Sequence, residues 1–150
     1  MDPALQMLLD RQSIIDLTIA YTYALDTKNF DALDDVFVPD ATAFLTEALT
    51  GREAIKGRVR RALEPLDVSQ HIISNHDIVI DGDRATCRCY LQAQHVRQAA
   101  PGSPNFIVAG RYEDRLVRTS VGWRIEHREL AIMWTDGNPA VARERGHHST

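Results

Sequence analysis

Residues 68–96, VSQHIISNHDIVIDGDRATCRCYLQAQHV, decide the fold class of this 150-residue chain. The second half of the stretch alternates strictly between apolar and polar side chains, which is the period of a half-buried strand. Asp81-Gly82 between the two halves is a strong signal for a two-residue hairpin turn. The stretch therefore predicts two long antiparallel strands, over about 68–80 and 84–98.

Two more strand-like runs follow at about 105–118 and 122–135. Short connections join consecutive runs, so the four strands should pair as an antiparallel meander. They are long compared with the usual five or six residues, and long strands twist and curl. In the first strand, apolar residues fall on both parities, so we expect both of its faces to be covered.

The N-terminal third predicts helices. Asp2 is a cap followed by proline, and Thr50 and Glu53 form a capping box. Residues 29–37 read as a short helix that Pro39-Asp40 closes. The expected elements are helices at about 3–25, 29–37 and 51–63 and a short strand at 41–45.

Three helices followed by an antiparallel meander is an α+β plan. Helices over the concave face of a strongly curved sheet make a cone, and a cone tends to enclose a pocket. The sequence shows no linker, so we expect one domain over residues 1–150 with a core at about 8–135. Residues 137–150 lose the periodicity and are expected to form a mobile tail.

Composition narrows the function classes. A net charge of -4 argues against nucleic-acid and membrane-surface proteins, which normally present a basic face. No apolar run approaches the roughly 18 residues of a membrane span, and the N-terminus lacks the basic start of a signal peptide. Cys87 and Cys89 read as small core residues in a reducing compartment, so we expect a cytoplasmic protein.

Asp26 is the most informative candidate residue. On a helical wheel it projects within about 20° of Leu8, Ile15 and Ile19, and a carboxylate on an apolar stripe is costly unless it is paired or faces a polar cavity. The alternative is that Asp26 or Thr27 caps the following helix at a frayed end.

Three histidines are candidates for a base or a ligand contact. His71 and His76 lie on the first meander strand, and strand periodicity does not choose between them. His95 ends the apolar face of the next strand. A structural role is the alternative for each.

Arg128 shares a strand parity with Leu130, Ile132 and Trp134. On that face an arginine needs a carboxylate partner or an anionic ligand, and the alternative is an outward salt bridge. Nucleophile-elbow, phosphate-loop and dinucleotide motifs do not occur, and no histidine or carboxylate cluster has metal spacing. We expect no metal and no cofactor.

The segments YTYALDTKNFDALDDVF, TGREAI, HIISNHDIVIDGDRA and GWRIEHREL together resemble the SnoaL-like branch of the nuclear-transport-factor-2-like (NTF2-like) superfamily. The resemblance covers about residues 8–135 and implies the cone-shaped α+β fold. Members such as scytalone dehydratase, bile-acid 7α-dehydratase and hexachlorocyclohexane dehydrochlorinase use an Asp–His dyad.

By position, the resemblance implies that Asp26 and His71 form this dyad. It matches Tyr21 to the tyrosine of the bile-acid enzyme, with Tyr23 in reserve because it is nearer to Asp26 on the wheel. It matches Arg128 to the active-site arginine of the dehydrochlorinase. We expect His95 and Trp134, with Arg128 and Tyr23, to bind substrate.

The implied function is a cofactor-independent dehydratase-type elimination or isomerisation of a small, mostly apolar cyclic substrate. His71 would remove a proton, Asp26 would hold the imidazole, and Tyr21 would donate to a developing oxyanion. The alternatives are a non-catalytic binding or assembly domain, like the small subunit of ring-hydroxylating dioxygenases, and a polyketide cyclase. The resemblance also implies a homo-oligomer, a dimer or a trimer.

Overall fold

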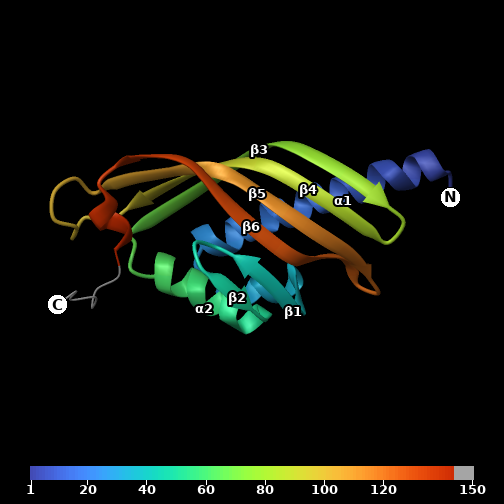
Figure 1. Cartoon of the computed structure of the whole chain (residues 1–150), viewed down its shortest axis with the longest axis horizontal. Helices are drawn as coiled ribbons and strands as arrows, with labels where there is room; N and C mark the ends of the chain where they lie inside the picture. The colour runs from blue at the N-terminus through green and yellow to red at the C-terminus, as the bar shows by residue number, and fades with distance from the viewer. Residues whose placement is uncertain (144–150) are drawn as a thin grey trace.

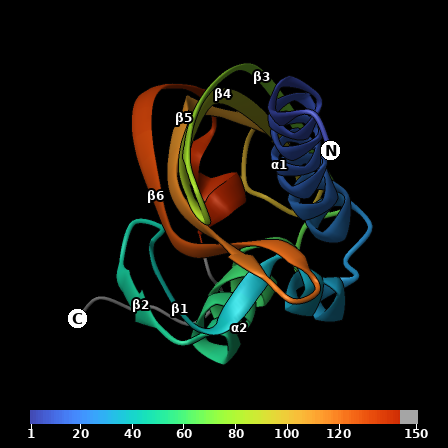
Figure 2. The ribbon, with the colours of Figure 1, turned by 90° about the vertical axis from the view of Figure 1, so that its right-hand side faces the viewer.

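The computed structural model describes residues 1–143, which form a curved six-stranded sheet with helices on its concave side (Figures 1 and 2). The elements in order are α1 (Pro3–Asp26), η1 (Phe30–Asp35), β1 (Phe37–Phe44), β2 (Ala48–Thr50), α2 (Arg52–Leu63), β3 (Val68–Asp81), β4 (Arg84–Val96), β5 (Asn105–Thr119), β6 (Gly122–Gly137) and η2 (Pro139–Ala142). The α+β class is confirmed. The helix expected over 29–37 is instead a 3-10 helix, η1, which leads directly into β1.

The sheet order is β2-β1-β6-β5-β4-β3. The four long strands pair antiparallel in sequence order, as the sequence predicts. The sequence did not predict the parallel pairing of β1 with β6, which extends the sheet beyond the meander. Pro39 lies inside β1 instead of closing a helix. It falls where the pairing of β1 with β6 is interrupted, so the backbone N–H that proline lacks is not needed for a sheet hydrogen bond.

A β-bulge divides β3 into two halves. Ser74 pairs with Tyr90 and the next pair is Asp77 with Arg88, so Asn75 and His76 together oppose one residue of β4. Asn75 has a φ of 60°. Because of the extra residue, odd-numbered side chains of β3 face the helices before the bulge and even-numbered side chains face them after it. The expectation that both faces of β3 are covered is therefore wrong: the apolar residues of the other parity are exposed, namely Ile72 and Val79.

A second bulge lies in β6 at Met133. Gly110 of β5 pairs with Ile132, and the next pair is Ala109 with Trp134. A Cβ on Gly110 would lie 2.2 Å from the carbonyl oxygen of Ala131, so only glycine fits at this crossing. The extra residue turns Trp134 to the opposite face from Ile132.

The two helix starts differ from each other. Asp2 caps α1 as expected, because its carboxylate accepts a hydrogen bond from the Ala4 N–H at 2.9 Å. The expected capping box at α2 is wrong. Thr50 is the last residue of β2, and the cap position is Gly51, whose φ of 92° favours glycine.

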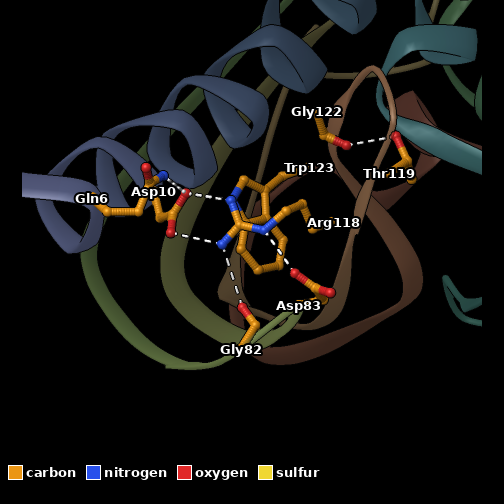
Figure 3. A network of polar contacts seen from close by, with 8 residues as sticks. All are labelled: Gln6, Asp10, Gly82, Asp83, Arg118, Thr119, Gly122 and Trp123. Carbon is orange, nitrogen blue, oxygen red and sulfur yellow. Dashed lines mark hydrogen bonds and ion pairs between the residues drawn. The ribbon is translucent and has the colours of Figure 1, made fainter. Parts of the chain in front are cut away.

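A partly buried polar cluster attaches the N-terminal half of α1 to the part of the sheet near the β3–β4 and β5–β6 turns (Figure 3). Asp10 accepts hydrogen bonds from both terminal nitrogens of Arg118, at 2.7 and 2.8 Å, and from the indole N–H of Trp123 at 3.1 Å. Arg118 also donates to Asp83 in the β3–β4 turn at 3.0 Å. These bonds hold the pKa of Asp10 well below its usual value, chiefly through the hydrogen bond from Arg118.

Residues 137–150, the expected tail, begin with the last residue of β6. The next residues form η2, in which Val141 is buried, and residues 144–150 lie outside the described residues. Among the helices of residues 1–143, none combines the length and the apolar character that crossing a bilayer requires.

Candidate functional site

A cavity of about 280 Å³ lies between the concave face of the sheet and the helices α1 and α2. Most of its lining is apolar and includes Leu25, Leu45, Val59, Leu63, Leu91 and Phe106. A few polar side chains share it, namely Tyr21, Thr46, Arg58, His71, His95 and Tyr112. A small apolar cavity with a few polar groups is the ordinary form of a site for a small organic molecule.

Asp26 contacts His71, which lines this cavity. Asp26 is the last residue of α1, and its Oδ1 lies 2.6 Å from Nδ1 of His71 on β3. The same carboxylate accepts hydrogen bonds from the backbone N–H of His71 at 2.8 Å and from the hydroxyl of Ser69 at 2.9 Å. Three donors from one strand therefore fix the carboxylate, and the carboxylate in turn orients the imidazole.

The protonation of the pair follows from these contacts. Burial alone would raise the pKa of Asp26, but the hydrogen bonds from His71 and Ser69 hold it below its usual value. An ionised carboxylate can only accept, so Nδ1 of His71 carries the proton. The lone pair of a neutral imidazole is then on Nε2. Only 6% of the His71 side chain is exposed and the residue lines the cavity, so the ring is largely shielded from bulk water.

The structure places Asp26 differently from the helical wheel. Leu8 and Ile19, which share its projected face, are exposed, so Asp26 does not continue a buried apolar stripe. It reaches the site because it ends the helix beside β3. Neither Asp26 nor Thr27 accepts a hydrogen bond from the start of η1, whose cap position is Asn29.

Tyr21 lies one and a half turns before Asp26 and packs against a buried ion pair. Arg128 donates two hydrogen bonds to Asp114, both at 2.8 Å, and both side chains are 0% exposed. The guanidinium lies over the rings of Tyr21 and Tyr112, at 4.3 and 3.9 Å from their centroids. Arg128 therefore has the carboxylate partner expected for an inward-facing arginine, and its guanidinium packs against the rings of both tyrosines.

Burial raises the pKa of Tyr21 and, more strongly, that of Tyr112, while the positive charge of Arg128 acts in the opposite direction. Both phenols are therefore protonated at neutral pH and can donate. The ring of Tyr21 lines the cavity, and only 2% of the residue is exposed.

His95 lies near His71, with ring centroids 6.1 Å apart, and also lines the cavity. Burial and the neighbouring His71 lower its pKa, which favours the neutral ring. Its Nδ1 donates to the carbonyl of Phe106 at 3.3 Å, which leaves Nε2 as an acceptor. His76, the other candidate on β3, lies outside the cavity lining and shares a hydrogen bond of 2.9 Å with Thr18 of α1.

Three expected substrate contacts need correction. Tyr23 is 68% exposed and does not line the cavity, because Tyr21 occupies the inward side of this turn of α1. Trp134 is turned to the convex face by the bulge at Met133. Arg128 is enclosed beneath Tyr21 and Tyr112, so it lies behind the lining and does not form part of it.

The sequence reasoning missed Ser69, Asp114, Tyr112 and Arg58. A signal existed for two of them, because Tyr112 and Asp114 share the parity of the apolar face of β5. An inward carboxylate opposite Arg128 could have been read from that alternation. Arg58 and Ser69 carried no such signal, since their roles depend on how α2 and α1 meet the sheet.

Comparison with known proteins identifies the family. Residues 6–129 match the family model of the SnoaL-like domain. An uncharacterized protein of Mycobacterium tuberculosis H37Rv, Rv2910c, is 35% identical over 124 residues, which is 79% of this chain and 82% of that protein.

Solved structures show the same fold. A scytalone dehydratase-like protein from Novosphingobium aromaticivorans is 26% identical, with a TM-score of 0.77 over 86% of this chain and 87% of that one. An NTF2-like superfamily protein from Salmonella enterica has a TM-score of 0.77 at 14% identity, over 96% of this chain and 99% of that one, and shows the fold alone. The sequence match leads to one assignment: this chain belongs to the SnoaL-like family.

Proposed function

We propose that this protein is a cofactor-independent lyase or isomerase that acts on a small, mostly apolar cyclic substrate. The observation that carries the proposal is the placement of His71. Its Nδ1 is bound to Asp26 at 2.6 Å, and its ring lines an apolar cavity. An imidazole whose Nδ1 is held by a carboxylate and whose ring is shielded from water has the chemistry of a general base.

The reaction that fits this site is the loss of water from a β-hydroxy ketone. Nε2 of His71 removes the proton on the carbon beside the carbonyl, and the electron pair of that C–H bond moves toward the carbonyl oxygen as an enolate. The enolate then re-forms the carbonyl while the C–C double bond forms and the C–O bond to the hydroxyl breaks. The departing hydroxyl takes the proton from the imidazolium, so the products are an enone and water and the imidazole is neutral again.

The remaining groups of the site act on charge that develops in this sequence. Asp26 stabilises the imidazolium and keeps the ring in a fixed orientation, which makes it a positioning residue. Tyr21 is protonated and donates to the enolate oxygen, while the acceptor nitrogen of His95 binds a substrate hydroxyl. A positioned base or acid each contributes about 10²–10⁴-fold, which is enough for a dehydration beside a carbonyl.

The test is turnover of a panel of cyclic β-hydroxy ketones, followed by the ultraviolet absorbance of the enone product. His71→Ala and Tyr21→Phe should lower kcat by about 10²–10⁴-fold. Asp26→Asn should lower kcat and also change the pH profile of kcat/KM, which loss of fold alone would not do. Thr18→Val, which removes the partner of His76 outside the cavity, is the matched control and should leave kcat unchanged within about twofold.

Two other functions make different predictions for the same experiment. A non-catalytic binding or assembly domain would bind cyclic compounds without turnover, and Asp26→Asn would leave binding unchanged. A polyketide cyclase would act on linear poly-β-ketones and form a ring bond instead of releasing an enone from a cyclic ketone. If His71→Ala retains full turnover of a confirmed substrate, the proposed mechanism is wrong.

A further inference from the structure

Two further polar residues line the cavity, Arg58 of α2 and Thr46 of the β1–β2 turn. Thr46 is exposed and Arg58 keeps 23% of its side chain exposed, so these residues mark the entrance. His71, at 6% exposure, marks the interior. Among the described residues that line the cavity, Arg58 is the one that carries a full positive charge at neutral pH.

The hydrogen bonds of Arg58 leave part of its guanidinium unused. Nη2 donates to the Thr46 hydroxyl at 3.1 Å, and Nε lies 3.4 Å from the carboxylate of Glu47. Nη1 makes no hydrogen bond to any of residues 1–143. Arg61 also contacts the Glu47 carboxylate, at 3.1 Å, so two guanidinium groups share that carboxylate.

We infer that Arg58 selects substrates that carry a carboxylate, which it binds at the entrance while His71 reaches the carbon to be deprotonated. A guanidinium binds a planar carboxylate through two parallel hydrogen bonds, and this recognises both charge and orientation. The apolar lining of the cavity accommodates a ring. This inference rests on the proposed function and narrows its substrate class to small cyclic carboxylic acids.

Binding of matched probe pairs tests the inference without turnover. The probes are cyclohexanecarboxylate, benzoate and 2-naphthoate, each compared with its primary amide, which has nearly the same shape and no charge. Isothermal titration calorimetry is done on the full chain and on His71→Ala, whose lack of the base separates binding from catalysis. At least one carboxylate should bind about tenfold or more tightly than its amide, and the preference should weaken with added salt.

Two variants should move the preference in opposite directions. Arg58→Gln should abolish it, whereas Glu47→Gln should increase it, because the competing carboxylate is removed. Arg60→Gln is the matched control, since Arg60 lies on the same helix, outside the cavity lining and over the ring of Phe30, and it should leave the preference unchanged. Retained melting temperatures will show that the variants are folded.

Several results would overturn the inference. These are equal binding of acid and amide, survival of the preference in Arg58→Gln, and absence of binding by all three carboxylates at about 10 mM. If the wild-type protein shows no preference for acids over amides but dehydrates neutral ketones normally, the role of Arg58 alone is overturned. If the wild-type protein prefers carboxylates over amides but turns over none of the ketones, the proposed function is contradicted and the role of Arg58 stands.

Discussion

Asp114→Asn should destabilise the protein by about 3–5 kcal/mol, because it removes the charge that compensates Arg128 in a fully buried site. Both side chains are 0% exposed and share two hydrogen bonds of 2.8 Å. Nη1 of Arg128 already lacks a hydrogen-bond partner within the described residues, so no spare acceptor stands ready. The neighbouring rings of Tyr21 and Tyr112 attract the cation but cannot replace a carboxylate.

The assay is urea unfolding followed by tryptophan fluorescence, with the melting temperature as a second measure. For a chain of this size the expected loss corresponds to about 6–20 °C. Asp77→Asn is the matched control, because Asp77 and Arg88 form a cross-strand ion pair at 2.9 Å with both side chains more than half exposed. Screening by solvent limits that pair to about 1 kcal/mol or less.

A double variant separates charge from packing. Asp114→Leu combined with Arg128→Met replaces the ion pair by apolar side chains, and it should recover most of the stability that Asp114→Asn loses. The reasoning is refuted if Asp114→Asn costs no more than Asp77→Asn. It is also refuted if the double variant is less stable than the single variant, since the loss would then come from shape and not from an uncompensated charge.

Three further predictions concern the sheet. Gly110→Ala should destabilise the protein by about 2 kcal/mol or more in urea unfolding, because its Cβ would lie 2.2 Å from a backbone oxygen, whereas Gly57→Ala, with 3.6 Å to a flexible side chain, should not. Burial raises the pKa of Cys87 to about 12 and that of Cys89 to about 11, so both thiols should react with iodoacetamide at pH 8 only after unfolding; rapid reaction of the native protein would contradict this. Burial and His71 hold the pKa of His95 below 6.5 in the folded protein. The stability that the neutral ring contributes is therefore complete above pH 6.5 and is lost as the pH falls. His95→Phe should flatten the dependence of unfolding free energy on pH between about 7.5 and 5.

The four long strands were predictable because strict alternation and short turns depend on local sequence. The dyad was predictable only through the family resemblance. Periodicity alone could not choose between His71 and His76, because the bulge at Asn75 brings both onto the face that packs against α1. A single extra residue reverses every later side chain of a strand, and nothing in the alternation of β3 identifies where the extra residue lies.

The same physical cause explains Trp134, whose parity with Arg128 is reversed by the bulge at Met133. The parallel pairing of β1 with β6 was not predictable either, because it joins segments that are more than 80 residues apart. Arg58 was missed for a related reason. Its place at the entrance follows from how α2 meets the β1–β2 turn, which is a property of tertiary packing and not of local sequence.

Helix α1 is attached to the sheet at two points, in its N-terminal half by Asp10 through Arg118 and Trp123 and at its C-terminal end by Asp26 through His71. The two carboxylates are 16 residues apart in sequence, which is about 24 Å along the helix axis. One inserted residue between them would lengthen the helix by about 1.5 Å and rotate one end against the other by about 100°. Both attachments could not then form together, so the length of α1 between Asp10 and Asp26 determines where Asp26 meets His71.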